Sequence, residues 1–386
     1  MTWYFASQAR LGPTLELGSR VRIAATEDGR IAAIERETEA AAGDIHLPGT
    51  VVPGLIDLHV HLALDGGPDV VASLESQQPH QLAARAVANA RSHLADGVTT
   101  IRDLGSPNGL MPEVLDATNL RVSWAAAITP PGGHGHFIAI QARGAAATTA
   151  AVGEAVTRGA SWIKLFATGG VITAGSNPGD LLASREELEA AVSSAHAAGL
   201  RVAAHAHGTE GILAAIDAGC DTVEHMSNVD DRVVEALLGS ETTAVSTLVA
   251  TERFVTSDAI ESSPAETVRK IRAHAPREAA SLRRLVAAGL VIGAGTDAGT
   301  THNPHGRGLA EEAALLHAAG MSAREVLGTL TTVNARCVEG EVGCLAAGMV
   351  ADLAAFDGDP GVDVSALSRP RCTVVGGRIV SGSPPA

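Results

Sequence analysis

Two histidines, His59 and His61, stand two residues apart in the run GLIDLHVHL at residues 54–62, which is otherwise almost wholly apolar. Side chains at positions i and i+2 of a β-strand point to the same face, so both imidazoles and Asp57 share one face. A metal site and a pair of hydrogen-bonded core histidines fit this run equally well. The rest of the chain has to decide between them.

Similar polar side chains stand at the ends of four other predicted strands. They are Lys164 in SWIKLF, His205 and then His207 in RVAAHAHG, His225 in DTVEHMS, and Asp297 in VIGAGTDAG. Each alone has an ordinary structural explanation, but together with the first pair they indicate one joint site. Imidazole nitrogen and carboxylate oxygen are typical ligands of zinc and related divalent metals. The ligands outnumber the needs of one tetrahedral ion with an open position, which favours two metals.

Lys164 is a notable choice of side chain for such a site. Lys164 and Lys270 are the only lysines among the 28 basic residues of the chain. An ammonium group is a poor neighbour for two dications, whereas a carbamylated lysine would be an anion able to bridge them.

These residues need a scaffold that brings strand ends together. Predicted strands occupy 55–62, 98–103, 121–127, 161–166, 200–205, 221–225, 242–247 and 290–296. Helical segments lie between most of them, and two begin with capping boxes, Ser184–Glu187 and Ser322–Glu325. This alternation predicts an α/β fold, a (β/α)8 TIM barrel over residues 54–348, with catalytic groups at the C-terminal strand ends. A doubly wound sheet is the alternative, and the lack of a phosphate-binding glycine loop after the first strand argues against it.

The two ends of the chain share another character. Residues 1–53 and 349–386 read as short strands separated by Gly, Asp and Pro turns. We therefore expect one small β-sandwich domain built from both termini, which suits a chain of 386 residues.

Composition narrows the function classes. The net charge is -15 and the pI about 5.4, with no basic stripe, so we expect no nucleic-acid partner. No stretch approaches the ~20 apolar residues of a membrane span. The four cysteines show no CxxC spacing, and the N-terminus shows no signal-peptide pattern, so we expect a cytoplasmic protein with free thiols. We also expect a small-molecule substrate and a homo-oligomer.

Several strings together carry a family resemblance. They are PGLIDLHVHL, PPGGHGH, KLFATGGV, AAHAHG, VEHMS, GTDAGT and GMVADLAAFDGDP. With them the chain resembles the amidohydrolase superfamily in its binuclear, carboxylated-lysine form. More narrowly it resembles the branch of imidazolonepropionase-like proteins, Xaa-Pro dipeptidases and zinc carboxypeptidases.

The resemblance implies roles for the strand-end residues. His59, His61 and Asp297 would bind one metal, and His205 and His225 the second. Carboxylated Lys164 and a hydroxide would bridge two divalent ions, expected to be Zn²⁺. Asp297 would take the proton of that hydroxide and pass it to the leaving nitrogen.

Other residues are candidates for substrate contact. In PPGGHGHF, the resemblance favours His134 over His136 as a residue near the scissile group. His207 stands where peptidase-like relatives often carry a tyrosine, which puts an Xaa-Pro dipeptidase activity in doubt. Candidate clamps on loops for a substrate carboxylate are Arg143, Arg253 and Arg307.

The leading expectation is a binuclear zinc hydrolase that cleaves an amide of a small molecule such as a dipeptide or N-acyl amino acid. Alternatives are a lactonase or phosphotriesterase, which could use the same metal pair, and an imidazolonepropionase-like cyclic amide hydrolase or mononuclear deaminase. Lys164 argues against the mononuclear enzymes, because such relatives typically lack it. A non-enzymatic scaffold that lost its metals is the remaining class, and the intact ligand set argues against it.

Overall fold

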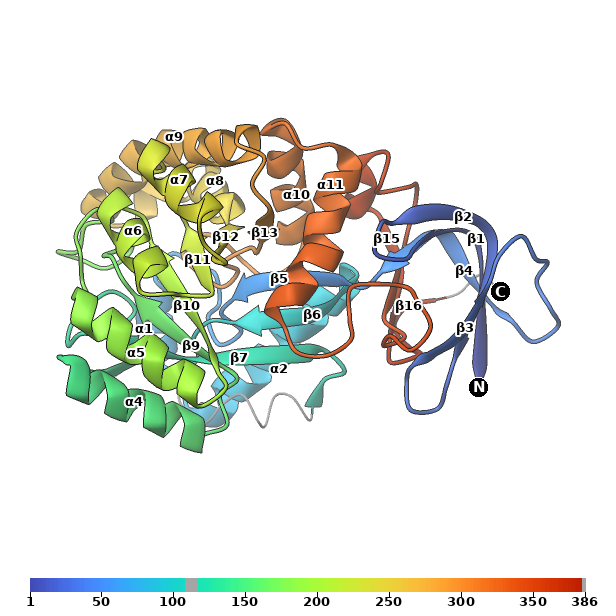
Figure 1. Cartoon of the computed structure of the whole chain (residues 1–386), viewed down its shortest axis with the longest axis horizontal. Coiled ribbons are helices and arrows are strands. Elements are labelled where there is room, and N and C mark those ends of the chain that lie inside the picture. The colour runs from blue at the N-terminus through green and yellow to red at the C-terminus, as the bar shows by residue number, and fades with distance from the viewer. Residues whose placement is uncertain (108–116, 384–386) are drawn as a thin grey trace.

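Eight parallel strands form a nearly closed barrel in the part of the chain that the computed structural model describes, residues 1–107 and 117–383 (Figure 1). In order of pairing they are β5 (Leu55–Val60), β6 (Val98–Asp103), β7 (Arg121–Thr129), β9 (Trp162–Phe166), β10 (Arg201–Ala206), β11 (Thr222–His225), β12 (Thr243–Ser246) and β13 (Ile292–Ala294). Every strand predicted for the barrel is present, and the predicted fold is confirmed.

The seam between the last and first strands lies directly beside the first histidine pair. The amide of Asp297 donates to the carbonyl of His59 at 2.7 Å, and the amide of His61 donates to the carbonyl of Ala298 at 2.9 Å. Gly295 permits this approach, because a Cβ there would lie 2.5 Å from the His59 nitrogen. The barrel therefore closes by bringing the two ends of its sequence together at the candidate site.

Helices surround the barrel on its outside (Figure 1). They are α1 (Val70–Glu75), α2 (Pro79–Ala95), α4 (Ala145–Thr157), α5 (Arg185–Ala197), α6 (Thr209–Asp217), α7 (Asp231–Leu238), α8 (Leu248–Thr256), α9 (Ala265–Ala287), α10 (Gly308–Ala318) and α11 (Ala323–Gly328). Both predicted capping boxes are formed, at the starts of α5 and α11. A short strand that the sequence did not predict, β8 (Ala139–Gln141), pairs with β7. Short helical turns also occur in the connections of the described residues: η1 (Ile260–Ser262), η2 (Thr329–Val333), η3 (Asn334–Cys337) and η4 (Val364–Ser368).

The two ends of the chain combine into a separate mixed sheet beside the barrel (Figure 1). Its strands are β1 (Thr2–Leu11), β2 (Glu16–Ala25), β3 (Ile31–Glu35), β4 (Ile45–Pro53), β14 (Leu353–Phe356), β15 (Pro370–Val375) and β16 (Arg378–Gly382). The order β16-β15-β14-β4-β1-β2-β3 interleaves the termini, and the sheet has its own apolar core. The small β domain expected from both termini is therefore present, and its strands form one mixed sheet. Because β4 leads into β5 through Gly54 alone, this sheet fixes where the first barrel strand begins.

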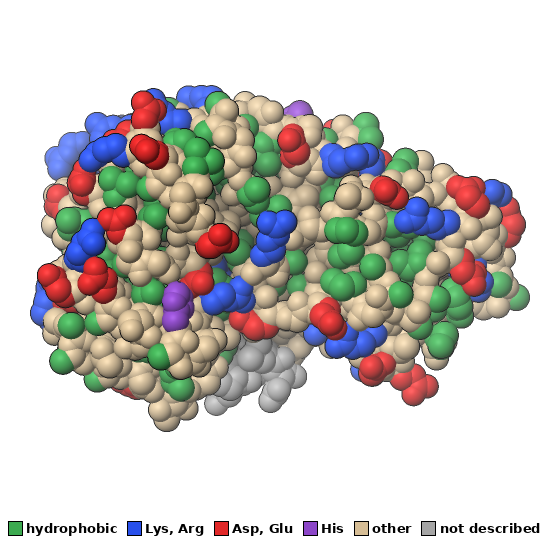
Figure 2. All heavy atoms as spheres, in the orientation of Figure 1, with side chains coloured by type: hydrophobic (Ala, Val, Ile, Leu, Met, Phe, Trp, Pro, Cys, Tyr) green, Lys and Arg blue, Asp and Glu red, His purple; other side chains and the backbone are tan. Residues whose placement is uncertain are grey.

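The surface carries both signs of charge. On the face shown in Figure 2, acidic and basic side chains are interspersed. None of the helices in residues 1–107 and 117–383 combines the length and apolar character that crossing a bilayer requires.

Candidate metal centre and pocket

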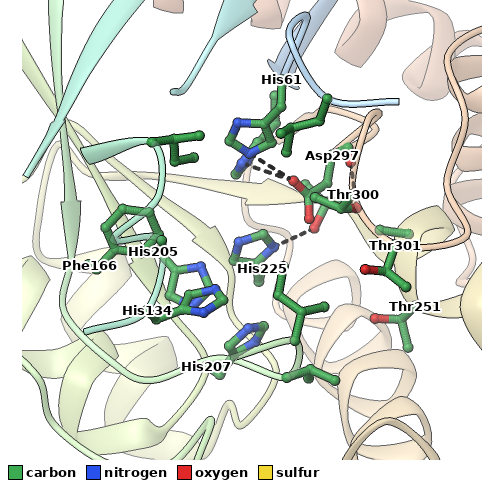
Figure 3. Close-up of a pocket in the computed structure, with 18 of the residues that line it drawn as sticks. His61, His134, Phe166, His205, His207, His225, Thr251, Asp297, Thr300 and Thr301 are labelled. Atoms are coloured by element: carbon green, nitrogen blue, oxygen red, sulfur yellow. Dashed lines mark hydrogen bonds and ion pairs between the residues drawn. The ribbon is translucent and has the colours of Figure 1, made fainter. Parts of the chain in front are cut away.

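A pocket of about 780 Å³, including its open mouth, lies at the C-terminal ends of the barrel strands (Figure 3). The structure brings all six predicted metal ligands into its lining: His59, His61, Lys164, His205, His225 and Asp297. Residues that are up to 238 positions apart in the sequence therefore share one cavity, as the barrel arrangement predicts.

The first cluster consists of His59, His61 and Asp297, whose candidate ligand atoms all lie within 4.8 Å of one another. Asp297 Oδ1 lies 3.2 Å from His61 Nε2 and 3.4 Å from His59 Nε2. Asp297 has a left-handed backbone, with φ 52°. Such conformations of residues other than glycine are uncommon and concentrate at functional sites, where the surrounding structure enforces them.

The second cluster consists of His205, His207 and His225, again with candidate ligand atoms within 4.8 Å of one another. The His205 and His225 rings are 4.6 Å apart, and the His207 ring stacks on His225 at 4.8 Å. His225 also has a left-handed backbone, with φ 71°. His207, expected only as a substrate contact, thus lies among the candidate ligands.

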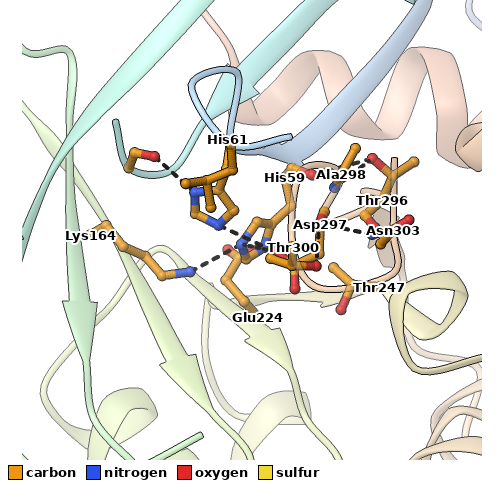
Figure 4. A network of polar contacts seen from close by, with 12 residues as sticks. His59, His61, Lys164, Glu224, Thr247, Thr296, Asp297, Ala298, Thr300 and Asn303 are labelled. Carbon is orange, nitrogen blue, oxygen red and sulfur yellow. Dashed lines mark hydrogen bonds and ion pairs between the residues drawn. The ribbon is translucent and has the colours of Figure 1, made fainter. Parts of the chain in front are cut away.

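The Lys164 side chain points toward His59 of the first cluster (Figure 4). Its Nζ is 3.4 Å from His59 Nε2, and the His59 and His225 rings are 5.0 Å apart. The side chain is 1% exposed. Burial lowers the pKa of Lys164 to about 8, so the neutral amine is more populated than in an ordinary lysine.

Each of the four predicted histidine ligands uses one ring nitrogen on a protein partner. His59 Nδ1 lies 3.0 Å from Glu224 Oε2, and His61 Nδ1 lies 2.9 Å from the Gly105 carbonyl. In the second cluster, His225 Nδ1 contacts the Thr247 hydroxyl at 2.7 Å and His205 Nε2 contacts the Gly169 carbonyl at 3.2 Å. Such partners fix the tautomer and leave the other nitrogen available to a metal.

Glu224 is held by an ion pair inside the barrel that the sequence analysis missed. Arg102 donates to Glu224 Oε1 at 2.8 Å, and both side chains are 0% exposed. The Thr222 hydroxyl donates to the same oxygen at 2.5 Å. The string VEHMS contains Glu224, but regular strand alternation places it on the opposite face from His225. The left-handed backbone of His225 ends that alternation, so Glu224 and His225 can both point toward the same site.

The protonation of the imidazoles fits metal binding. Burial lowers the pKa values of His59, His205, His207 and His225 well below the usual value, so these rings are neutral at physiological pH. For His61, burial also disfavours the cation, but hydrogen bonding and charge from Asp297 outweigh it and raise the pKa. Buried imidazoles that converge with the partly exposed Asp297 carboxylate form a donor set that fits divalent metal ions.

The PPGGHGH loop delivers one of its two histidines to the pocket. His134 lines the pocket, lies 4.7 Å from the His205 ring, and contacts the Thr173 hydroxyl through Nδ1 at 2.7 Å. His136 does not line the pocket, and its Nδ1 lies 3.1 Å from the Gly133 carbonyl. Gly170 makes room for the His134 ring, because a Cβ there would lie 2.3 Å from its Nε2. The preference for His134 agrees with this placement.

The three arginines expected as carboxylate clamps lie outside the pocket lining. Arg307 is exposed and is the N-cap residue of α10, and its backbone amide donates to Asp96. Arg143 is exposed and donates to the Leu182 carbonyl at 3.4 Å. Arg253 pairs with Glu311 and also bonds to Asn303, so its guanidinium is fully engaged in holding a loop. The expectation that all three arginines lie on loops is wrong for Arg253, which belongs to helix α8. Sequence could not separate these roles, because it does not show which way a side chain turns.

A buried polar chain that the sequence analysis also missed supports His207. His207 Nδ1 lies 2.8 Å from the Ser227 hydroxyl and 3.0 Å from His274 Nε2. His274 is followed one helical turn later by Glu278, which accepts from the Thr251 hydroxyl at 2.6 Å. These residues hold the His207 ring with its other nitrogen free. No sequence motif predicts these contacts, because His274 and Glu278 look like ordinary positions of a long helix.

Comparisons with known proteins agree with this architecture. A model described as "Amidohydrolase family" matches residues 50–380. An uncharacterized protein of Mycobacterium tuberculosis is 32% identical over 364 residues, which cover 91% of this chain and 90% of the relative. The ochratoxinase of Aspergillus niger is 29% identical over 378 residues, which cover 87% and 77% of the two chains.

Solved structures give the same result. A Xaa-Pro dipeptidase crystallised with bound methionine superposes with a TM-score of 0.89 at 26% identity, covering 99% of this chain and 100% of the other. The crystal structure of A. niger ochratoxinase superposes with a TM-score of 0.86 at 26% identity, covering 99% and 95%. Both are similar to this chain over its barrel and its terminal sheet. The chain belongs to the amidohydrolase family.

Proposed function

We propose that this protein is a metal-dependent hydrolase that cleaves an amide bond of a small molecule, with two metal ions, expected to be Zn²⁺, in its pocket. The observation that carries the proposal is the convergence of two ligand clusters and a buried lysine on one pocket. Two divalent ions bound there would supply a polarised scissile carbonyl and an activated water. His59, His61 and Asp297 would hold one ion, and His205 and His225 the other, with His207 as a further imidazole.

Lys164 would supply the negative charge that the second cluster lacks. A neutral lysine amine adds to carbon dioxide, forming an N–C bond and releasing one proton, and yields an anionic carbamate. The burial of Lys164 favours the neutral amine that this reaction needs. Its position 3.4 Å from His59 Nε2 suits a group shared between the clusters.

Two other residues would act on the substrate. Asp297 would take a proton from the attacking water and pass it to the leaving nitrogen, so that a carboxylic acid and an amine are released. His134 would contact the substrate near the scissile bond, with its ring fixed by the Thr173 hydroxyl. The relatives named a Xaa-Pro dipeptidase and an ochratoxinase support the choice of an amide over a lactone or phosphotriester.

The test is hydrolysis by zinc-loaded protein of libraries of dipeptides, N-acyl amino acids, neutral amides and lactones, before and after metal removal. We expect amide cleavage that disappears with a chelator and returns with zinc. Protein that holds its metals and cleaves no amide, or prefers lactones, would contradict the proposal.

A further inference from the structure

The pocket above the metal-binding residues is walled by apolar side chains. The residues that form this wall are Leu64, Phe137, Ile138, Val171, Phe254 and Ile271. Three of them, Val171, Phe254 and Ile271, belong to a small apolar cluster separate from the barrel core. These three residues come from the loop after β9 and from helices α8 and α9, so this part of the wall is built from three separate segments. A surface of this kind favours an apolar substrate group by removing it from water.

The same pocket offers no free cation to a substrate. Among its described lining residues Lys164 is the only lysine or arginine, and it belongs to the metal centre. Residues 108–116, which follow β6 and lie outside the described part, contain neither lysine nor arginine. A substrate carboxylate placed against the wall would therefore lose its hydration without gaining a countercharge.

The polar groups that remain in the wall are neutral hydroxyls. Thr251 donates to Glu278 and Thr300 donates to the Asp297 carbonyl at 2.8 Å. Thr301 lines the pocket, is 6% exposed, and has no hydrogen-bond partner for its hydroxyl among residues 1–107 and 117–383. A hydroxyl can bond to a carbonyl or an amide of a neutral substrate, but it cannot balance a full charge.

We propose that this pocket selects neutral amides with an apolar acyl or amine group, and discriminates against amides that carry a free carboxylate beside the scissile bond. The inference rests on the proposed function and narrows its substrate class. It separates this chain from an enzyme for dipeptides and N-acyl amino acids, whose substrates keep such a carboxylate. In the reaction the C–N bond breaks, the oxygen of water joins the acyl carbon, and a proton goes to the amine.

A matched substrate pair tests the proposal. N-benzoyl-L-leucine and N-benzoyl-L-leucinamide have the same shape and differ in the charge of one group. With zinc-loaded protein we measure benzoate release and compare kcat/KM for the two compounds. We expect the neutral compound to be favoured by at least about tenfold, as for one uncompensated charge in a desolvated site. Equal values, or a preference for the carboxylate, would overturn the inference while leaving the proposed function standing.

Binding provides a readout that does not depend on turnover. Ketomethylene analogues of the two compounds cannot be hydrolysed, and calorimetry gives their dissociation constants. Tighter binding of the neutral analogue supports the inference even if neither amide is cleaved. The lack of cleavage would then count against the proposed function and not against the inference. Tighter binding of the charged analogue overturns the inference.

A variant and its matched control sharpen the result. Thr301→Arg adds a cation to the wall, and Thr301→Gln adds a neutral side chain of similar reach. The arginine variant should shift the preference toward N-benzoyl-L-leucine by at least about tenfold relative to the glutamine variant. Identical preferences in the two variants would show that charge in the wall does not set the selectivity.

Discussion

The two ligand clusters differ in the charge that surrounds them. His59 and His61 have the Asp297 carboxylate beside them, and His59 is also backed by the buried Glu224–Arg102 pair. The second cluster consists of imidazoles, and the partners that hold them are neutral, namely one backbone carbonyl, two hydroxyls and another imidazole. Coulomb attraction makes a buried dication far more favourable beside a carboxylate than among neutral groups. We infer that the first cluster holds its metal alone, whereas the second depends on an anion from Lys164.

The largest effect is expected at Lys164. Lys164→Arg should lose nearly all turnover and the second metal, because arginine keeps a positive charge and cannot form a carbamate. Lys164→Ala should lose both as well, but propionate should restore part of each by occupying the vacated place. Elemental analysis and amide turnover with and without propionate provide the measurement.

The other lysine provides the control for this experiment. Lys270 is buried in α9 and donates to the carbonyls of Thr173 and Ser176, each at 2.9 Å. Lys270→Arg should keep both metals and show no response to propionate. If Lys164→Arg retained two metals and normal turnover, the difference between the clusters would have another origin.

The next effect is expected at Asp297. Asp297→Asn nearly preserves shape and keeps an oxygen toward the first cluster, but it cannot accept a proton as a carboxylate does. Turnover should fall by about 10²–10⁴-fold. Metal content measured on the same sample separates the two roles of this residue: wild-type turnover with metals in place would remove Asp297 from proton transfer.

A smaller effect is expected from substituting the residues that hydrogen-bond to the histidine ligands. Glu224→Gln should weaken metal binding at the first cluster by ~10–100-fold, because His59 loses its anionic partner. Thr247→Val is the matched change behind His225 and should weaken only the second site. Metal titrations of both variants test whether the clusters respond separately. Equal weakening of both sites by either change would contradict the comparison.

The smallest effect concerns a carboxyl group near the second cluster. Glu312 is 0% exposed and accepts from Ser246 at 2.5 Å and from Val249 at 2.7 Å, holding the end of β12 that carries Thr247. Burial raises the pKa of Glu312 to about 7 from 4.5. A raised carboxyl pKa means that the folded state binds the proton more tightly, so its stabilising contribution is lost as pH rises through about 7.

Metal-free wild type should therefore lose free energy of unfolding between about pH 5 and pH 8 relative to Glu312→Gln, which cannot ionise. Urea denaturation of the two proteins at both pH values provides the comparison. A difference between them that stays constant with pH would show that Glu312 is ionised in the fold throughout.

The metal-ligand residues could be predicted because the sequence patterns that indicate them are local and periodic. Strand alternation predicts which way a side chain points when it belongs to an HxH pair, is a lysine in an apolar strand, or is a histidine at a strand end. The order of strands in a barrel then brings the strand ends together. All six predicted ligands accordingly line one pocket. The capping boxes at Ser184 and Ser322 were predictable for the same reason, since capping depends on residues three positions apart.

The missing features depend on long-range geometry. Glu224 reaches His59 across the barrel, and His274 reaches His207 from a helix 67 positions later. Neither contact produces a periodic pattern in the sequence. The arginines show the converse case: Arg253 has the right chemistry for a clamp, but it lies in helix α8 and directs its guanidinium to Glu311. The direction of a surface side chain is set by the packed structure, and composition alone does not reveal it.

The central claim is that two clusters of unequal charge share one lysine-derived anion. Its most direct test is elemental analysis combined with a high-resolution crystal structure of protein grown with zinc and bicarbonate. The account predicts two metals per chain, and electron density for a carboxylate group extending from Lys164 Nζ between them. An active enzyme that saturates at one metal, or that holds two metals beside an unmodified Lys164 amine, would contradict it.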